Sequence, residues 1–233
     1  MFAWRAVRRV VARRSVSHDA GVRGLQVSVR WSAVSLAVSG LLVATVAPWH
    51  PSIFDRPVHE VVQGFGAWTL LHATMVVAPV LALFGAAGLV AVHEGRLGRL
   101  GQVGLIVEVV GVVAASALAA TEAIVFPELA DQAPALLAVD GPLLASPLFI
   151  GVGALALGWP LGLSLLGLAA ARSDVFGRAP GILLGVSGPM FLALAGPFVP
   201  VAGALSTVLF GGAQVWWGVL LWRAAPLTAT TDA

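Results

Sequence analysis

An all-α bundle of six transmembrane helices, with both termini in the cytoplasm, is the fold that this sequence predicts, and three observations support it. The chain of 233 residues is 59% hydrophobic and only 10% charged, whereas about a quarter of the residues of a soluble domain are charged. Six apolar stretches each have the roughly 20 residues that a helix needs to cross a hydrocarbon core of about 30 Å. Twelve of the thirteen basic residues fall on one side of these stretches.

The six spans follow one another from residue 31 to residue 222. We expect them at Trp31–Trp49, Ala67–Val92, Gly101–Phe126, Leu143–Ala171, Gly181–Val199 and Val201–Trp222. The fourth contains Pro147 and Pro160, which predict a kink because proline has no backbone N–H to donate. Pro189 and Pro197 are expected to interrupt the fifth helix and free backbone carbonyls that can line a cavity.

The orientation follows from the arginines, because short cytoplasmic loops of membrane proteins retain the positive charge. Seven arginines precede the first span, and only Arg56 lies on the opposite side. The remaining arginines of the cytoplasmic side are Arg96, Arg99, Arg172, Arg178 and Arg223. This distribution predicts a multi-pass protein of the cell membrane. The membrane topology therefore explains the excess of arginine, which does not indicate nucleic-acid binding.

Two segments flank the transmembrane domain of residues 31–223. Residues 1–30 form a basic cytoplasmic segment in which Trp4 and Val7 share one side of a helical wheel and Arg5 and Arg9 the other. Such a helix can lie on the anionic lipids of the inner leaflet. The alternative is a disordered arginine-rich tail that only enforces topology. Residues 224–233 form a cytoplasmic tail.

The outer loops carry acidic residues. Their carboxylates are Asp55, Glu60, Glu128, Asp131 and Asp140, with His50 and His59 nearby. Acidic residues accumulate in loops from which arginine is excluded. One interpretation is therefore an acidic surface that is simply exposed to water. The other is a cation-collecting surface, in which His50, His59 and Glu60 are candidate metal ligands because imidazoles and carboxylates bind hard or borderline metals. No spacing among them matches a recognised metal motif.

The third span divides into two faces when it is placed on a helical wheel with 3.6 residues per turn. One face has small residues and two acids: Gly101, Gly104, Glu108, Gly111, Ala115, Ala119 and Glu122. The other has aliphatic residues: Val103, Ile106, Val110, Val113, Ala117 and Ile124. Small residues mark the faces on which membrane helices approach each other. Glu108 and Glu122 are therefore expected to face the bundle, roughly 21 Å apart along the axis.

Few polar residues are available as partners for these acids. A charged carboxylate in the membrane costs at least about 2.5–3.5 kcal/mol unless it is paired, solvated or protonated. His72 of the second span lies at a depth comparable to that of Glu122, and Gln214 lies within the sixth span. The pair His72 and Glu122 is either a polar lock between two helices or part of a site for a cation, a proton or a ligand head group. We expect no cofactor, because a bis-histidine haem site needs a second histidine within the spans.

The chain also contains a candidate internal duplication. "GLVAVHEGRLGRLGQVGLIV", from Gly88 to Val107, aligns without a gap with "GLAAARSDVFGRAPGILLGV", from Gly167 to Val186. Both segments place Gly-Arg in a cytoplasmic turn. The alignment predicts that the second and third spans form a helical hairpin which the fourth and fifth repeat in the same orientation, as parallel repeats do in some transporters.

Three classes of function remain open. The best guess is a transport-like role for a small solute, a cation or a proton, using the acids that face the bundle. The alternatives are a non-enzymatic scaffold or accessory subunit and a lipid-modifying enzyme of the outer leaflet. No nucleophile, zinc or nucleotide motif is present, and without Cys or Lys there is neither a thiolate site nor a Schiff base. The glycine-rich faces "GWPLG" and "GILLG" serve packing within the bundle or association with another subunit.

The segment "LLHATMVVAPVLALFGAAGLVAVHEGRLGRLGQVGLIVEVVGVVAASALAATEAIVFPELA" resembles small multi-span bacterial membrane proteins of uncharacterised activity. The resemblance rests on the Gly-Arg-Leu-Gly turn and on an acidic residue late in the following helix. It implies a helical membrane protein and no particular activity.

Overall fold

The structure is a computed structural model, and it describes residues 28–93 and 95–225. This part of the chain is all-α, with helices and no strand. The basic segment that was expected to form an interfacial helix lies outside the described residues except for its last three positions. Most of the C-terminal tail lies outside them as well.

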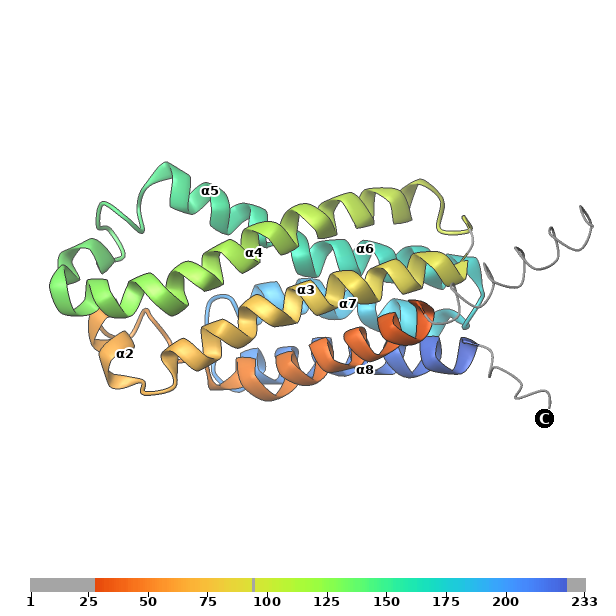
Figure 1. The fold of residues 1–233 in the computed structure, drawn as a ribbon, viewed down its shortest axis with the longest axis horizontal. Helices are drawn as coiled ribbons and strands as arrows, with labels where there is room; N and C mark the ends of the chain where they lie inside the picture. Colours follow the sequence, from red (N-terminus) through yellow and green to blue (C-terminus); the bar gives the residue numbers. More distant parts are fainter. Residues whose placement is uncertain (1–27, 94, 226–233) are drawn as a thin grey trace, which may run out of the picture.

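Five helices in the described part are long and apolar enough to cross a membrane, and they run along one axis (Figure 1). They are Ser28–Trp49, α3 (Trp68–His93), α4 (Gly98–Gln132), the segment Pro147–Ser173 and α8 (Ala202–Ala224). A sixth apolar helix, α7 (Arg178–Leu194), has only 17 residues. Short elements fill the connections: η1 (Ala47–Trp49), α2 (Val58–Gly64) and η2 (Pro134–Leu137).

The fourth expected span is broken near its middle. Its first part is α5 (Pro147–Ala156) and its second is α6 (Gly158–Ser173), with Leu157 between them. Ser146 caps α5 by accepting a hydrogen bond from the Phe149 N–H at 3.2 Å, and Pro147 occupies the first helical position, where no N–H is needed. Pro160 lies in the first turn of α6, where proline is tolerated. The expected kink is therefore a one-residue interruption at Leu157, whose backbone stays in the right-handed helical region.

The fifth expected span, Gly181–Val199, differs from the helix that the structure contains. Helix α7 begins earlier, at Arg178, and ends at Leu194. Gly196, Pro197 and Pro200 follow, and prolines cannot supply the N–H groups that would continue the ladder. The Val199 N–H donates to the Leu194 carbonyl at 2.9 Å, which closes a folded connection over residues 195–201. Pro189, in contrast, lies inside α7.

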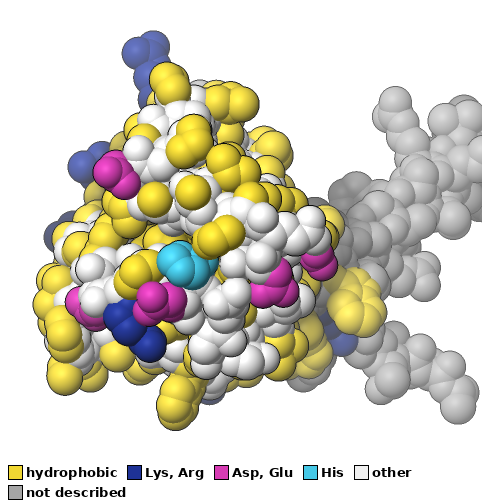
Figure 2. All heavy atoms as spheres, turned by 90° about the vertical axis from the view of Figure 1, so that its left-hand side faces the viewer, with side chains coloured by type: hydrophobic (Ala, Val, Ile, Leu, Met, Phe, Trp, Pro, Cys, Tyr) yellow, Lys and Arg dark blue, Asp and Glu magenta, His cyan; other side chains and the backbone are white. Residues whose placement is uncertain are grey.

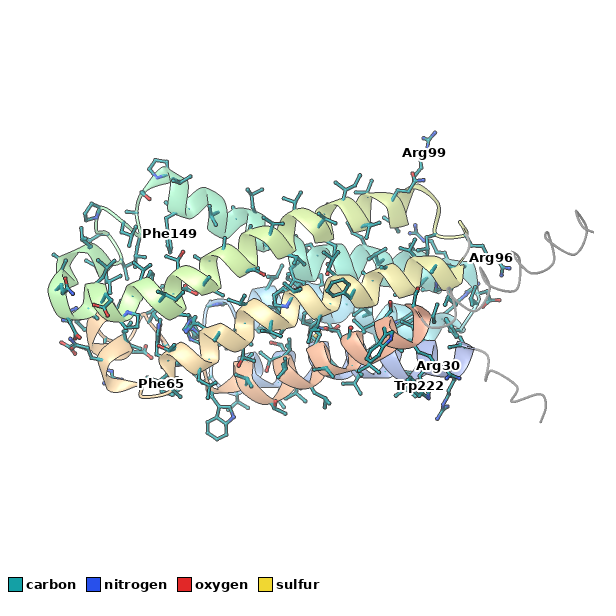
Figure 3. All side chains as sticks on the ribbon, in the orientation of Figure 1. Arg30, Phe65, Arg96, Arg99, Phe149 and Trp222 are labelled. Atoms are coloured by element: carbon teal, nitrogen blue, oxygen red, sulfur yellow. The ribbon has the colours of Figure 1, made fainter. Side chains whose placement is uncertain are left out.

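Helix α4 is longer than its predicted span because it continues past Pro127 to Gln132. Its 35 residues extend over roughly 52 Å at 1.5 Å per residue. The additional turns pack against α2 in a small second hydrophobic cluster: Val58, Val61, Val62, Trp68, Phe126, Ala130 and Leu137. Phe65 and Phe149 pack against this cluster at the same end of the bundle (Figure 3).

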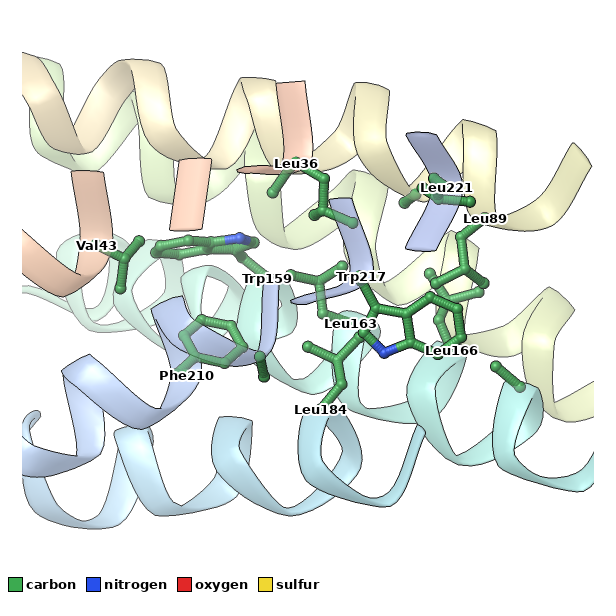
Figure 4. Close-up of a cluster of buried hydrophobic side chains, with 14 of the residues drawn as sticks. Leu36, Val43, Leu89, Trp159, Leu163, Leu166, Leu184, Phe210, Trp217 and Leu221 are labelled. Atoms are coloured by element: carbon green, nitrogen blue, oxygen red, sulfur yellow. The ribbon is translucent and has the colours of Figure 1, made fainter. Parts of the chain in front are cut away.

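The main core runs along the centre of the bundle, and Figure 4 shows part of it. Large side chains such as Trp217, Phe210 and Leu163 are completely or almost completely buried there. Helices α4 and α6 cross so closely that a Cβ atom on Gly111 would overlap the backbone of Gly158 and Trp159. Glycine is thus what allows this crossing.

The two ends of the bundle differ in charge. One end, here called the arginine end, carries both ends of the described chain and the turns that contain Arg96 and Arg99 (Figures 1 and 3). The opposite end, here called the acidic end, carries α2 and the 133–146 connection. Figure 2 looks at this end and shows acidic side chains together with histidine on its surface.

Candidate functional site

The candidate site is built around His72, which lies in the second turn of α3. Its Nδ1–H donates to the Trp68 carbonyl one turn earlier, at 2.9 Å, because the i−4 carbonyl faces the same side of a helix. The Trp68 ring covers the imidazole, with the two ring centroids 4.2 Å apart. The Trp68 indole N–H in turn donates to the Glu122 backbone carbonyl at 2.7 Å. These contacts fix α3 against α4 at the level of Glu122.

His72 and Glu122 are brought together as the sequence predicts. His72 Nε2 lies 3.5 Å from Glu122 Oε2. The His72 side chain is only 2% exposed, whereas that of Glu122 is 25% exposed. The carboxyl of Glu122 therefore has the imidazole on one side and open space on the other.

His50 is the third member of the cluster, and it follows directly after the first span. Its Nδ1–H donates to the Pro51 carbonyl at 2.8 Å, and its Nε2 lies 3.1 Å from Nε2 of His72. The Phe198 ring packs on it, with centroids 4.9 Å apart. Burial lowers the pKa of His50, and the hydrogen bond to Pro51 offsets only part of this effect.

A cavity of about 390 Å³ opens beside this cluster, in the half of the bundle nearer the acidic end. Its walls come from the end of the first span, from α3 to α8 and from the connection after α7. Its polar side chains in the described structure are those of His50, Glu122 and Thr207. The aromatic part of the wall consists of Trp159, Phe191 and Phe198. The connection after α7 contributes to this lining. Helix α7 itself is not interrupted at Pro189 and ends at Leu194, before Pro197, so the expected break within the fifth helix is absent.

The other candidates of the ion or ligand pathway lie elsewhere. Glu108 is fully buried at the crossing of α4 and α6, where Gly162 meets its backbone, and it does not line the cavity. Gln214 is also fully buried, and its Oε1 accepts a hydrogen bond from the Ser39 hydroxyl at 2.8 Å. Gln214 Nε2 has no hydrogen-bond partner within the described residues, whereas the Glu108 carboxyl lies beside the backbone of Leu163 in α6.

The outer-face metal candidates do not assemble. His59 and Glu60 are neighbours in α2, and Glu60 is exposed. His50 instead points to His72. Within residues 28–93 and 95–225, no group of three His, Cys, Asp or Glu side chains is arranged to hold a metal ion.

Sequence reasoning assigned His50 to the outer loops and missed its place beside His72. The available signal was its position immediately after the first span, which puts it at nearly the same depth as His72 and Glu122. The Ser39–Gln214 hydrogen bond was missed as well, because nothing in the helical pattern of the first span singles out Ser39.

Comparisons with protein-family models, curated proteins and solved structures find no match for this chain. The class of the protein therefore rests on its helices and its residues. These helices, with their length and apolar composition, are compatible with an integral membrane protein.

Proposed function

We propose that the bundle spans the cell membrane in six crossings, with both termini in the cytoplasm. The charge distribution supports this, since Arg30, Arg96 and Arg99 gather at one end of the bundle (Figure 3). Acids dominate the other end. Positively charged loops are retained on the cytoplasmic side, so the arginine end is the cytoplasmic one and the cavity lies in the outer half.

We further propose that the protein binds a small, mainly apolar solute in this cavity, as the loading step of a transport-like role. The observation that carries the proposal is the Glu122 carboxyl, which borders a cavity whose walls are mainly apolar. Ligand sites are typically cavities of about 300–1,000 Å³ with apolar walls and a few polar groups that fix the orientation of the ligand. The cavity has this size and this composition.

The position of the carboxyl also argues against a purely structural lock. A polar pair that only holds two helices together stabilises them most when both partners are buried, because a low local dielectric strengthens a buried hydrogen bond. Here His72 is buried, whereas the Glu122 side chain is partly exposed to the cavity. The open side of Glu122 remains accessible to the polar part of a solute.

The test uses the full-length protein in lipid nanodiscs and a neutral bromoalkyl alcohol, whose bromine quenches tryptophan fluorescence at short range. Trp159 lines the cavity, so we expect saturable quenching. Ala204→Phe, on the cavity face of α8, should raise the half-saturation concentration by about tenfold or more, since it fills the space that the probe needs.

Leu205→Phe is the matched control, because Leu205 is the next residue of α8 and is 63% exposed on the outer surface of the bundle. It should leave the quenching curve unchanged. Quenching that never saturates, or that is the same in both variants, would show only partitioning of the probe into lipid and would refute the proposal.

A second candidate function is the passage of a cation or a proton, and the placement of Glu108 favours it. Glu108 shares with Glu122 the face of α4 that packs against the bundle. The side chain is completely buried, and the backbone of Leu163 in α6 lies beside its carboxyl. A buried carboxyl without a charged partner is costly, and ionisable groups inside membrane helices commonly mark the path of a proton or an ion.

A further inference from the structure

The three polar atoms of the cluster that face one another are all hydrogen-bond acceptors when both imidazoles are neutral and Glu122 is ionised. A backbone carbonyl can only accept, so the ring nitrogens bonded to Pro51 and Trp68 must carry the protons. In neutral rings, Nε2 of His50 and Nε2 of His72 are then bare lone pairs, and they lie only 3.1 Å apart. Glu122 Oε2 adds a third acceptor, 3.5 Å from His72 Nε2.

This convergence calls for a positively charged hydrogen-bond donor. A proton shared between the imidazoles is one candidate, but burial lowers the pKa of His50 and so works against it. A metal ion is another, but no three ligating side chains of the described chain are arranged to hold one. An ammonium group is the third. It has several N–H donors, and it can reach His50 and Glu122 from the cavity that both residues line.

We propose that the solute bound in the outer cavity is an amphiphilic amine, with its protonated head between Glu122 and His50 and its apolar body against the cavity wall. This inference rests on the proposed binding function and specifies the class of ligand. It does not require that the solute also crosses the membrane.

The charges and rings around the cavity agree with a cationic head. The described lining contains one carboxyl and no arginine, and the chain has no lysine. The rings of Phe198 and Trp159 also belong to the lining, and the faces of aromatic rings attract ammonium groups. An anionic head group would find no positive partner in this lining and would be repelled by Glu122.

The experiment compares three bromoalkyl probes that share one chain length and differ only in the head: a primary ammonium, an alcohol and a sulfate. The full-length protein is again in nanodiscs of zwitterionic lipid, so that the surface does not concentrate either ion. We expect the ammonium probe to half-saturate at a concentration about tenfold or more below that of the alcohol, because charge-assisted hydrogen bonds are the stronger ones. The sulfate probe should bind most weakly.

Glu122→Gln keeps the size of the side chain and removes its charge. It should bring the ratio between ammonium and alcohol affinities close to one. Glu128→Gln, a matched change at an exposed position of the same helix, should leave the ratio as it is in the unchanged protein.

Each result has a distinct meaning. Equal affinity for ammonium and alcohol in the unchanged protein overturns the amine assignment and leaves the binding function standing, whereas no saturable binding of any probe overturns both. In the last part of the experiment, zinc ions alone are added to the protein. If one equivalent of zinc raises the melting temperature and displaces the ammonium probe, and if both effects need His50 and His72, the site is a metal site and the amine assignment is wrong.

Discussion

Glu108 and Glu122 illustrate how different the surroundings of two carboxyls on one helix face can be. Glu122 borders a cavity and an imidazole, and its backbone is fixed by Trp68. Glu108 is enclosed by the crossing of α4 and α6, with Gly162 against its backbone. Because of this difference, Glu122 could contact a solute in the cavity, whereas Glu108 could contact only a proton or an ion that passes between the helices.

Proton or cation passage therefore predicts a specific behaviour for Glu108→Gln. The amide has the same size and remains folded, but it cannot bind and release a proton. In liposomes that contain a pH-sensitive dye, the unchanged protein should speed the equilibration of an imposed pH difference, and the variant should lose most of this effect. Glu128→Gln is the control and should behave as the unchanged protein does. Equal rates in Glu108→Gln and the unchanged protein would contradict this second function.

At the scale of elements, the crossing of α4 and α6 depends on a glycine at position 111. We expect Gly111→Ala to destabilise the protein by about 1–3 kcal/mol, the usual effect of overpacking a dense core, because the added methyl group meets backbone that cannot rotate away. The measurement is the melting temperature in detergent. Gly151→Ala in α5 is the control, since a Cβ there meets nothing within 4 Å. An unchanged melting temperature for Gly111→Ala would mean that the two helices are not in contact at this point.

The faces of α4 show what the sequence alone can predict. Ile106, Val113 and Ile124 are each at least 65% exposed, whereas Gly104 and Gly111 are buried. The predicted division of α4 into a buried face of small residues and an exposed aliphatic face is confirmed. A pattern that repeats every 3.6 residues indicates which side of a helix packs against its neighbours. The proximity of His72 to Glu122 could be predicted in the same way, from equal depth on neighbouring helices.

The connections show where that reasoning stops. His50 reaches His72 only through the path of the chain after Trp49, and residues 195–201 fold back through a hydrogen bond between Val199 and Leu194. Neither path has a period that a sequence pattern could reveal. The position of the cavity depends on both, so the cluster could be predicted in part and the cavity could not.

The candidate duplication can now be compared with the backbone of the two turns at the arginine end. In the register that aligns Gly88 with Gly167, Gly95 corresponds to Asp174 and Gly98 to Gly177. All four have a positive φ, of 79°, 60°, 59° and 74° in that order. Such values are uncommon outside glycine, so their coincidence at equivalent positions supports the proposal that the two hairpins are copies of one unit.

At the scale of the whole molecule, the proposed topology predicts which surfaces are accessible from outside the cell. The chain has no cysteine, so single cysteines can be introduced at Gln132 and at Ala179, which are both exposed and lie at opposite ends of the bundle. A membrane-impermeant maleimide applied to intact cells should label the first and not the second.

Permeabilised cells provide the control for this experiment, because both cysteines should react once the reagent can enter. Labelling of the cysteine at position 179 in sealed cells, with none at position 132, would invert the proposed orientation. The cavity would then lie in the inner half of the membrane.

The first span begins and α8 ends at the same end of the bundle (Figure 1). A chain that leaves a bundle at the end where it entered has traversed it an even number of times (Figure 1). The five long helices make an odd number of traverses, so the proposed topology needs α7 as the sixth. Its 17 residues extend over only about 26 Å, and the chain then folds through the 195–201 connection before α8 begins at Ala202. The shortness of α7 therefore leaves room at the acidic end of the bundle for the connection that lines the cavity.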